Sequence, residues 1–303
     1  MIKAALIDAE TPLGGEILRL LTHHPDVDLV GLVSPSNAGV DVTEIHHGLI
    51  GERPLRFRSD LPDKADAIFF CGNTTPDENI HARAAKGEVK IFDISRTSYA
   101  SGTGTCVPAI SEIFRKPMVR GASECRILSP LETTLLIALF PLARNLMLSS
   151  QIEVEVETGE DVARDLDQVR AAELAQRLLH SIQQSFTDSV NIKVKKLPGN
   201  RRGLRLRTRL RLSIPVKDLA PLYDEVYDDH NFTFLLPRPR ELHEVEGTNK
   251  CLICLQHVGE SELDVEAIVD GRMRGWAGEA VLAMNLMFGL YEKTGLQLKA
   301  STY

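Results

Sequence analysis

The sequence predicts an α/β protein with two domains, one with a doubly wound parallel sheet and a second α+β domain whose sheet is mostly antiparallel. In the first third of the chain, short apolar runs alternate with helical patterns, which is typical of βαβ units. Later segments alternate polar and apolar residues with a period of two, as half-exposed antiparallel strands do. With 303 residues, the chain is long enough to form two hydrophobic cores.

The composition is that of an ordinary soluble globular protein, with 43% hydrophobic and 25% charged residues. No apolar run approaches the ~20 residues of a membrane span, and the chain opens directly on a strand-like run. We therefore expect a cytoplasmic protein without membrane contact. Its five cysteines are an odd number, which favours reduced thiols over a disulfide framework. A net charge of −7 disfavours general nucleic-acid binding.

The first domain opens with a predicted strand over 2–7, a helix over 16–21 and a second strand over 27–33. Further apolar runs predict strands over 65–71 and 90–95. Together these segments predict a parallel sheet, and ligands in such sheets bind beyond the carboxyl ends of the strands.

The loop after the first strand is where a dinucleotide-binding sheet places its glycines. Only Gly14 and Gly15 stand there, while Asp8 and Glu10 add negative charge. The loop is therefore a poor pyrophosphate cradle. After the second strand, the hydroxyl-rich segment 34–39 could receive a ribose or its 2′-phosphate, or could form an ordinary turn.

A helix-start signal follows the apolar run 126–128. Ser129 suits the N-cap, Pro130 the first helical position, and Glu132 the third position of a capping box. The apolar stretch 133–140 then predicts a buried helix. A helix N-terminus at the end of a strand is a ready anion site, but here a proline and a carboxylate occupy it.

The second domain is predicted from several strand patterns and one long helix over 163–184. The strands are expected over 151–157, 192–195, 203–212, 251–255 and 263–269. A final helix over 275–287 is expected to return to the first domain.

One strand of the second domain carries a row of arginines, Arg205, Arg207, Arg209 and Arg211. The row could bind an anionic partner, or it could pair across strands with acidic rows such as Glu153, Glu155 and Glu157. We favour the cross-strand pairing. Cys251 and Cys254 have redox-motif spacing, but three residues apart in a strand they point to opposite faces. We therefore predict no metal site and no disulfide.

Five stretches carry a family resemblance, and they are 24–27, 36–39, 139–143, 249–253 and 277–290. Together they resemble the N-acetyl-γ-glutamyl-phosphate reductase family, within the semialdehyde dehydrogenase superfamily, over essentially the whole chain. The resemblance implies a Rossmann-like NADP-binding domain over 1–130 and 277–303, and an α+β substrate and dimerisation domain over 131–276. It also implies a homo-oligomer, dimer or tetramer, that reduces an acyl phosphate to a semialdehyde in arginine biosynthesis through a cysteine thioester.

The departures from the family pattern fall on its functional positions. The position of the family's cysteine falls on Pro130, or on Ser129 or Glu132 after a small shift, and that of its general-base histidine falls near Arg170. The first two glycines of the nucleotide loop fall on Asp8 and Thr11. The residues that remain as vestigial cofactor-binding candidates are Gly14, Ser34, Ser36, Asn37, Gly278 and Asn285.

Two hypotheses follow. The leading one is a catalytically degenerate relative, with the fold kept, the chemistry lost and NADP bound weakly or not at all. The alternative is a divergent but active NADP-dependent reductase that uses other residues. Rescue of the nucleophile by Cys106 or Cys125 is disfavoured, because a thioester route needs an activated thiolate beside a base.

Overall fold

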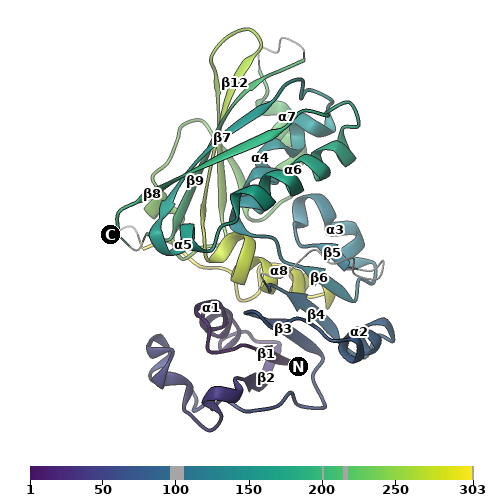
Figure 1. The fold of residues 1–303 in the computed structure, drawn as a ribbon, viewed down its shortest axis with the longest axis vertical. Helices are drawn as coiled ribbons and strands as arrows, with labels where there is room; N and C mark the ends of the chain where they lie inside the picture. The colour runs from purple at the N-terminus through teal and green to yellow at the C-terminus, as the bar shows by residue number, and fades with distance from the viewer. Residues whose placement is uncertain (96–105, 200, 214–217, 302–303) are drawn as a thin grey trace. The chain divides into compact units, whose positions relative to one another are not determined.

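The computed structural model describes residues 1–95, 106–199, 201–213 and 218–301. The chain divides into two compact units. The first comprises Met1–Leu128 and Trp276–Gln297, and the second comprises Ser129–Gly275 together with the C-terminal residues from Leu298. In the described part of the chain, each unit contains one six-stranded sheet (Figure 1).

The sheet of the first unit is parallel throughout, as the βαβ pattern predicted. Its strand order is β2-β1-β3-β4-β6-β5. The strands are β1 (Ile2–Ile7), β2 (Val27–Val33), β3 (Ala67–Phe70), β4 (Lys90–Asp93), β5 (Cys106–Pro108) and β6 (Glu124–Arg126). The order reverses at β1, which has β2 on one side and β3 on the other, and such a switch point is where doubly wound sheets bind ligands.

Helices cover both faces of this sheet because each strand buries side chains on both sides. On one face, Ile80 and Ala84 of α2 pack with Ile68, Phe70 and Ile91. Phe69 and Phe92 alternate with these strand residues and stack on each other with ring centroids 4.8 Å apart. The helices are α1 (Pro12–Leu21), α2 (Glu78–Ala85), α3 (Ser111–Val119) and α8 (Gly278–Met287), with single turns η1 (Pro35–Asn37), η2 (Val42–Glu44) and η3 (His47–Leu49).

The sheet of the second unit is mixed, with three antiparallel and two parallel pairings in the order β10-β11-β12-β9-β7-β8. Its strands are β7 (Ile152–Gly159), β8 (Val190–Leu197), β9 (Gly203–Arg211), β10 (Thr233–Leu236), β11 (Cys251–His257) and β12 (Glu262–Asp270). Helices α4 (Pro130–Arg144), α6 (Gln168–Ile182) and α7 (Ala220–Tyr227) pack in this unit (Figure 1), which also contains the short turn η4 (Leu242–Glu244). The π-helical turn η5 (Met273–Ala277) begins at the end of this unit and runs into the first.

The single helix predicted over 163–184 is wrong in one respect, because the structure has two helices there. A five-residue helix α5 (Glu160–Arg164) ends before Asp165, and α6 begins after Asp167. The Asp167 carboxylate accepts the backbone N–H of Arg170 at 3.0 Å. An aspartate that caps a new helix in this way offers the backbone an alternative to continuing the old one.

The arginine row pairs across strands, as predicted. In the register of β7 and β9, Glu153 faces Arg209, Glu155 faces Arg207, and Glu157 faces Arg205. On the other side of β9, strand β12 adds a second acidic row, so that Arg207 Nε lies 2.7 Å from Glu266 and Arg209 Nε lies 2.7 Å from Asp264. One face of the sheet is thus a ladder of alternating charge that is largely matched within the domain.

Helix α4 is buried on nearly every side, and tyrosines of α7 bind its backbone. Pro141 lies inside α4 and has no N–H, so the carbonyl of Ile137 loses its helical donor. The hydroxyl of Tyr227 donates to this carbonyl instead. Tyr223 donates to the next carbonyl, of Ala138, at 2.6 Å. Among the described residues, no helix combines the length and apolar character that crossing a membrane requires.

Candidate functional site

The N-terminus of α4 is closed by a complete capping box. The Ser129 hydroxyl accepts the Glu132 N–H at 3.3 Å, and the Glu132 carboxylate accepts the Ser129 N–H at 2.7 Å. Pro130 at the first helical position supplies no donor. The free N–H groups of a helix N-terminus are what bind an anion there. At α4 the side chains of Ser129 and Glu132 already accept N–H groups at this end of the helix.

The backbone of the second unit covers Pro130 directly. Gly275 has a φ of +86°, and a β-carbon built on it would lie 2.6 Å from the Cα of Pro130. Glycine is therefore required here, both for the left-handed conformation and for the close approach. Pro130 itself is buried, which leaves no open face above it for a substrate.

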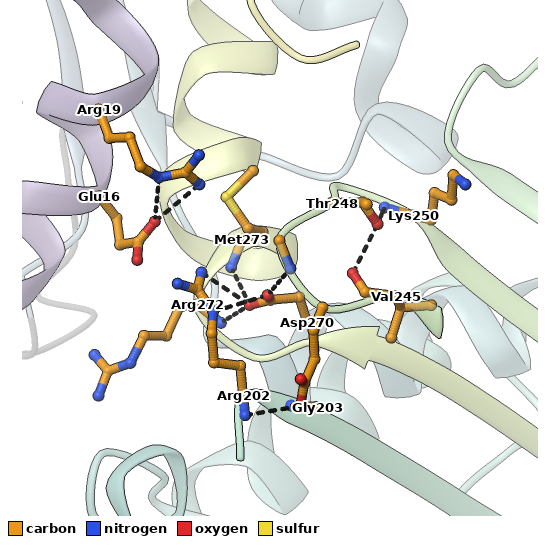
Figure 2. Close-up of polar contacts among 12 residues, drawn as sticks. Glu16, Arg19, Arg202, Gly203, Val245, Thr248, Lys250, Asp270, Arg272 and Met273 are labelled. Carbon is orange, nitrogen blue, oxygen red and sulfur yellow. Dashed lines mark hydrogen bonds and ion pairs between the residues drawn. The ribbon is translucent and has the colours of Figure 1, made fainter. Parts of the chain in front are cut away.

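A buried carboxylate fixes the turn that brings Gly275 to this place. Asp270, at the end of β12, is fully buried and accepts the backbone N–H groups of Arg272 at 2.7 Å and Met273 at 3.0 Å (Figure 2). It also accepts the backbone N–H of Gly247 at 2.5 Å. The guanidinium of Arg202 adds an ion pair at 2.9 Å. Because this carboxylate is satisfied from several sides, it holds the η5 turn in one conformation.

Arg170 lies beside the capping box. Its Nε is 3.9 Å from Glu132 Oε1, with the Glu132 side chain 6% and the Arg170 side chain 27% exposed. A guanidinium stays protonated at neutral pH and has no acceptor atom, so Arg170 cannot take a proton from a nucleophile. The pair instead compensates the charge of the buried Glu132.

The loop between β1 and α1 is likewise closed on itself. The Thr11 hydroxyl caps α1 by accepting the Gly14 N–H at 3.0 Å, and it donates to the carbonyls of Asp8 and Cys71. Pro12 at the first helical position has no N–H. A β-carbon on Gly14 would lie 2.5 Å from the carbonyl oxygen of Ala9, so this glycine serves close packing of helix on loop.

Asp8 joins this loop to the one after β3. Its φ is +57°, a left-handed conformation that is uncommon for residues other than glycine. Its carboxylate accepts both the backbone N–H and the hydroxyl of Thr74, each at 2.8 Å. A carboxylate thus spans the two loops that flank the switch point of the sheet, and it would repel a diphosphate brought there.

A family model for the semialdehyde dehydrogenase NAD-binding domain matches residues 3–116. The N-acetyl-γ-glutamyl-phosphate reductase of Parabacteroides distasonis is 33% identical, and that of Bacteroides thetaiotaomicron is 30% identical, each over all of both chains. This chain belongs to the N-acetyl-γ-glutamyl-phosphate reductase family. Among solved structures, aspartate semialdehyde dehydrogenase II of Vibrio cholerae has a similar fold, with a TM-score of 0.72 at 14% identity, covering 96% of this chain and 99% of that one.

Family membership implies a nicotinamide cofactor. In a doubly wound sheet its diphosphate would lie against the loop between β1 and α1. In a nucleotide-binding loop the first glycine allows the tight turn, the second lets the backbone approach the pyrophosphate, and the third allows close packing. Here Asp8 makes the turn in a left-handed conformation, Thr11 closes the helix, and Gly14 alone keeps its packing role. The residues present do not fit a bound diphosphate.

The other residues predicted as cofactor-binding candidates form hydrogen bonds within the chain or are buried. Asn37 donates from Nδ2 to the hydroxyls of Ser34 at 2.8 Å and Ser36 at 3.2 Å, which makes the segment a self-contained turn. Asn285 is fully buried, with Oδ1 3.0 Å from His24 Nε2 and Nδ2 donating to the carbonyls of Glu292 and Thr294. Gly278 is buried at the start of α8.

The thiols of this family member are poor nucleophiles. Cys106 is exposed at the start of β5, but partial desolvation by neighbouring atoms, with the charges of Glu124 and Asp93, raises its pKa to about 11. Burial also raises the pKa values of Cys71 and Cys125 well above the ordinary range. The nucleophile of a thioester route is the thiolate, and almost none of it would form at these cysteines at neutral pH. All the cysteines are free, and Cys251 and Cys254 are buried in β11.

Sequence reasoning found the capping box and the weak glycine loop, but it missed three relationships. It did not place Arg170 against Glu132, although the two residues had been singled out for related roles. It did not find the bridge from Asp8 to Thr74, nor the Asp270 cluster that fixes the turn at Gly275. No motif marks the contacts of Arg170 with Glu132 or of Asp8 with Thr74, because each joins segments that are distant in sequence. In the Asp270 cluster the bonds to Arg272 and Met273 are local, whereas those from Gly247 and Arg202 come from distant segments.

Proposed function

We propose that this chain is a catalytically degenerate N-acetyl-γ-glutamyl-phosphate reductase homologue, which keeps the fold and binds NADP weakly or not at all. The observation that carries the proposal is the capping box of Ser129 and Glu132 around Pro130. The family resemblance assigns the nucleophile to this position. Here it holds a proline covered by Gly275 and a carboxylate that would repel an acyl phosphate.

Two further features support this proposal. Arg170, at the position that the resemblance assigns to the general base, is paired with Glu132 and cannot accept a proton. The Asp8 carboxylate and the capped α1 helix disfavour the diphosphate of a dinucleotide. Loss of nucleophile, base and cofactor loop together is what a protein retained for another role would show.

The assembly and location of the protein belong to the same proposal. We propose a cytoplasmic homo-oligomer, a dimer or tetramer as the family resemblance implies, that binds neither nucleic acid nor membrane. The internal matching of the charge ladder supports the absence of nucleic-acid binding, because Arg207 and Arg209 already pair with Glu266 and Asp264.

The test is a turnover assay with N-acetyl-γ-glutamyl phosphate and NADPH, with the reductase of Parabacteroides distasonis as the positive control. We expect NADPH oxidation by the control and none above background by this chain. In parallel, a cofactor present at 100 times its dissociation constant would stabilise the fold by about 2.7 kcal/mol, and we expect no such stabilisation with millimolar NADPH.

The alternative, a divergent but active NADP-dependent reductase, gives the opposite results. It requires NADPH-dependent stabilisation and steady turnover that a single substitution in this chain abolishes. Replacing Cys106 and Cys125 one at a time by serine would show whether either thiol carries such turnover. Turnover lost in one of these variants would overturn the proposal.

A further inference from the structure

The sheet of the second unit has two edge strands, β8 and β10, which differ in how well they are protected. Strand β8 exposes three lysines, Lys193, Lys195 and Lys196, and such charges discourage another strand from pairing with an edge. Strand β10 carries no charged residue, and its Phe234 is 39% exposed. Within the described part of the chain, no strand lies beyond β10, so this edge is the one suited to pairing.

The backbone of β10 directs hydrogen-bonding groups to both sides of the strand. The Phe232 carbonyl accepts the Cys251 N–H at 2.7 Å, and β10 runs parallel to β11 from there. Because alternate residues of a strand bond the same neighbour, Phe234 and Leu236 bond β11. Leu235, between them, directs its N–H and its carbonyl away from the sheet. A strand added at this edge would find a donor and an acceptor at Leu235.

A groove of about 410 Å³ lies beside β10, between this strand and the end of α7. Phe234 and Leu236 line it, and both side chains reach the surface. Asp224 and Asp228 add two carboxylates to the lining, against the single ammonium group of Lys250. The groove is therefore apolar along the strand and acidic beside α7.

Charges of opposite sign flank β10 in the sequence. Asp224 and Asp228 precede the strand, whereas Arg238 follows it. All three side chains are exposed, and none forms an ion pair with another residue that the structure describes. Arg238 stands between Pro237 and Pro239, which favour an extended backbone, so it continues the line of the strand. A strand with an acidic start and a basic end is complementary to a second copy of itself in the antiparallel direction.

We propose that β10 pairs with β10 of a second copy of this chain, antiparallel, about a two-fold axis beside Leu235. In an antiparallel pair the start of one strand lies beside the end of the other, so the partner subunit's Arg238 meets Asp224 and Asp228, and the symmetry forms this contact twice. Phe234 is then covered by the partner's strand. The inference rests on the homo-oligomer of the proposed function and names a surface through which it forms.

The experiment is sedimentation velocity of the full chain with charges reversed at either end of β10. The double variant Asp224→Arg with Asp228→Arg places like charges together in a symmetric pair, and so does Arg238→Asp. We expect each variant alone to show half the mass of the wild-type assembly. An equimolar mixture of the two should regain the wild-type mass, because every arginine then faces aspartates. Lys196→Glu, at the opposite edge of the sheet, is the matched control and should leave the mass unchanged.

Phe234→Lys tests the edge itself, since it places a guarding charge on β10, and it should also halve the mass while the circular dichroism spectrum is preserved. Reversed variants that keep the wild-type mass, or a mixture that does not regain it, would overturn this interface and leave the proposed function intact. A wild-type monomer at micromolar concentrations would overturn both the interface and the homo-oligomer. Turnover with NADPH would instead overturn the proposed loss of catalysis and not the interface.

Discussion

The carboxylate of Asp8 and the hydroxyl of Thr74 are 2.8 Å apart, although 66 residues separate them in sequence. The same carboxylate accepts the Thr74 N–H. Asp8 holds these bonds from a left-handed backbone conformation with a φ of +57°. The contact therefore joins two loops of the first unit at the expense of local strain.

Substitutions at Asp8 should distinguish the stabilising effect of its hydrogen bonds to Thr74 from the destabilising effect of its left-handed backbone conformation. Asp8→Ala loses both bonds and keeps the strain of ~1–2 kcal/mol, so we expect it to be the least stable. Asp8→Gly loses the bonds but relieves the strain. Asp8→Asn keeps an acceptor and tolerates the left-handed region. Urea unfolding should give the highest free energy of unfolding for Asp8→Asn, a lower one for Asp8→Gly and the lowest for Asp8→Ala. An alanine variant as stable as the asparagine variant would contradict the role of the bridge.

The capping box at α4 should be a net stabilising feature. Ser129→Ala and Glu132→Ala should each cost about 1 kcal/mol or somewhat more, as lost N-caps do. Glu132→Gln should cost less, because glutamine also completes a capping box. Arg170→Gln should cost at most ~1 kcal/mol, since its contact with Glu132 is long. Chemical denaturation of each variant measures its free energy of unfolding. A more stable Glu132→Ala protein would point to a strained functional site instead.

Tyr227 should matter more to stability than its neighbour Tyr223. Tyr227→Phe leaves the buried carbonyl of Ile137 without a donor, which should cost ~1–3 kcal/mol. Tyr223→Phe is the matched control, since the carbonyl of Ala138 can still receive the helical N–H of Leu142. Adding Pro141→Ala to Tyr227→Phe supplies the missing N–H and should recover much of the loss. Strictly additive effects in this double-mutant cycle would contradict the coupling.

His24 should make the protein less stable in acid. Burial lowers the pKa of His24, and this effect outweighs the hydrogen bond to Asn285 and the charge of Asp26, which both raise it. The unfolded state then binds the proton more readily than the folded state. The contribution of His24 to the free energy of unfolding is fully present above the ordinary histidine pKa of about 6.5. It is lost as the pH falls through the lower pKa of His24 in the folded protein.

The measurement is the free energy of unfolding between pH 7.5 and pH 5. We expect His24→Gln to flatten the pH dependence, because it removes the titrating ring and keeps an N–H donor for Asn285. His23→Gln is the matched control, because the His23 side chain, next to His24 in the sequence, is 73% exposed. Equal flattening by both variants would show that burial of His24 is not the cause.

The sequence by itself determined much of the fold. Period-two and apolar patterns identified most strands of both sheets, because burial of one or both faces imposes those patterns. They missed the short strands β5 (Cys106–Pro108) and β10 (Thr233–Leu236). Local chemistry identified the capping box of Ser129 and Glu132, because all of its atoms lie within four residues. The alternation on β9 also allowed the pairing of Arg207 and Arg209 with acidic rows to be predicted. The helix break at Asp167 was missed because its polar spacing also fits a continuous helix.

Only the tertiary structure decided which distant groups meet. The contacts of Asp8 with Thr74, Arg170 with Glu132, and Gly275 with Pro130 depend on how loops and helix ends converge after the sheets form. The groove beside β10 likewise depends on where the end of α7 meets the sheet. The physical reason is that periodicity records burial along one segment, whereas hydrogen bonds, ion pairs and cavities depend on the three-dimensional distance between segments.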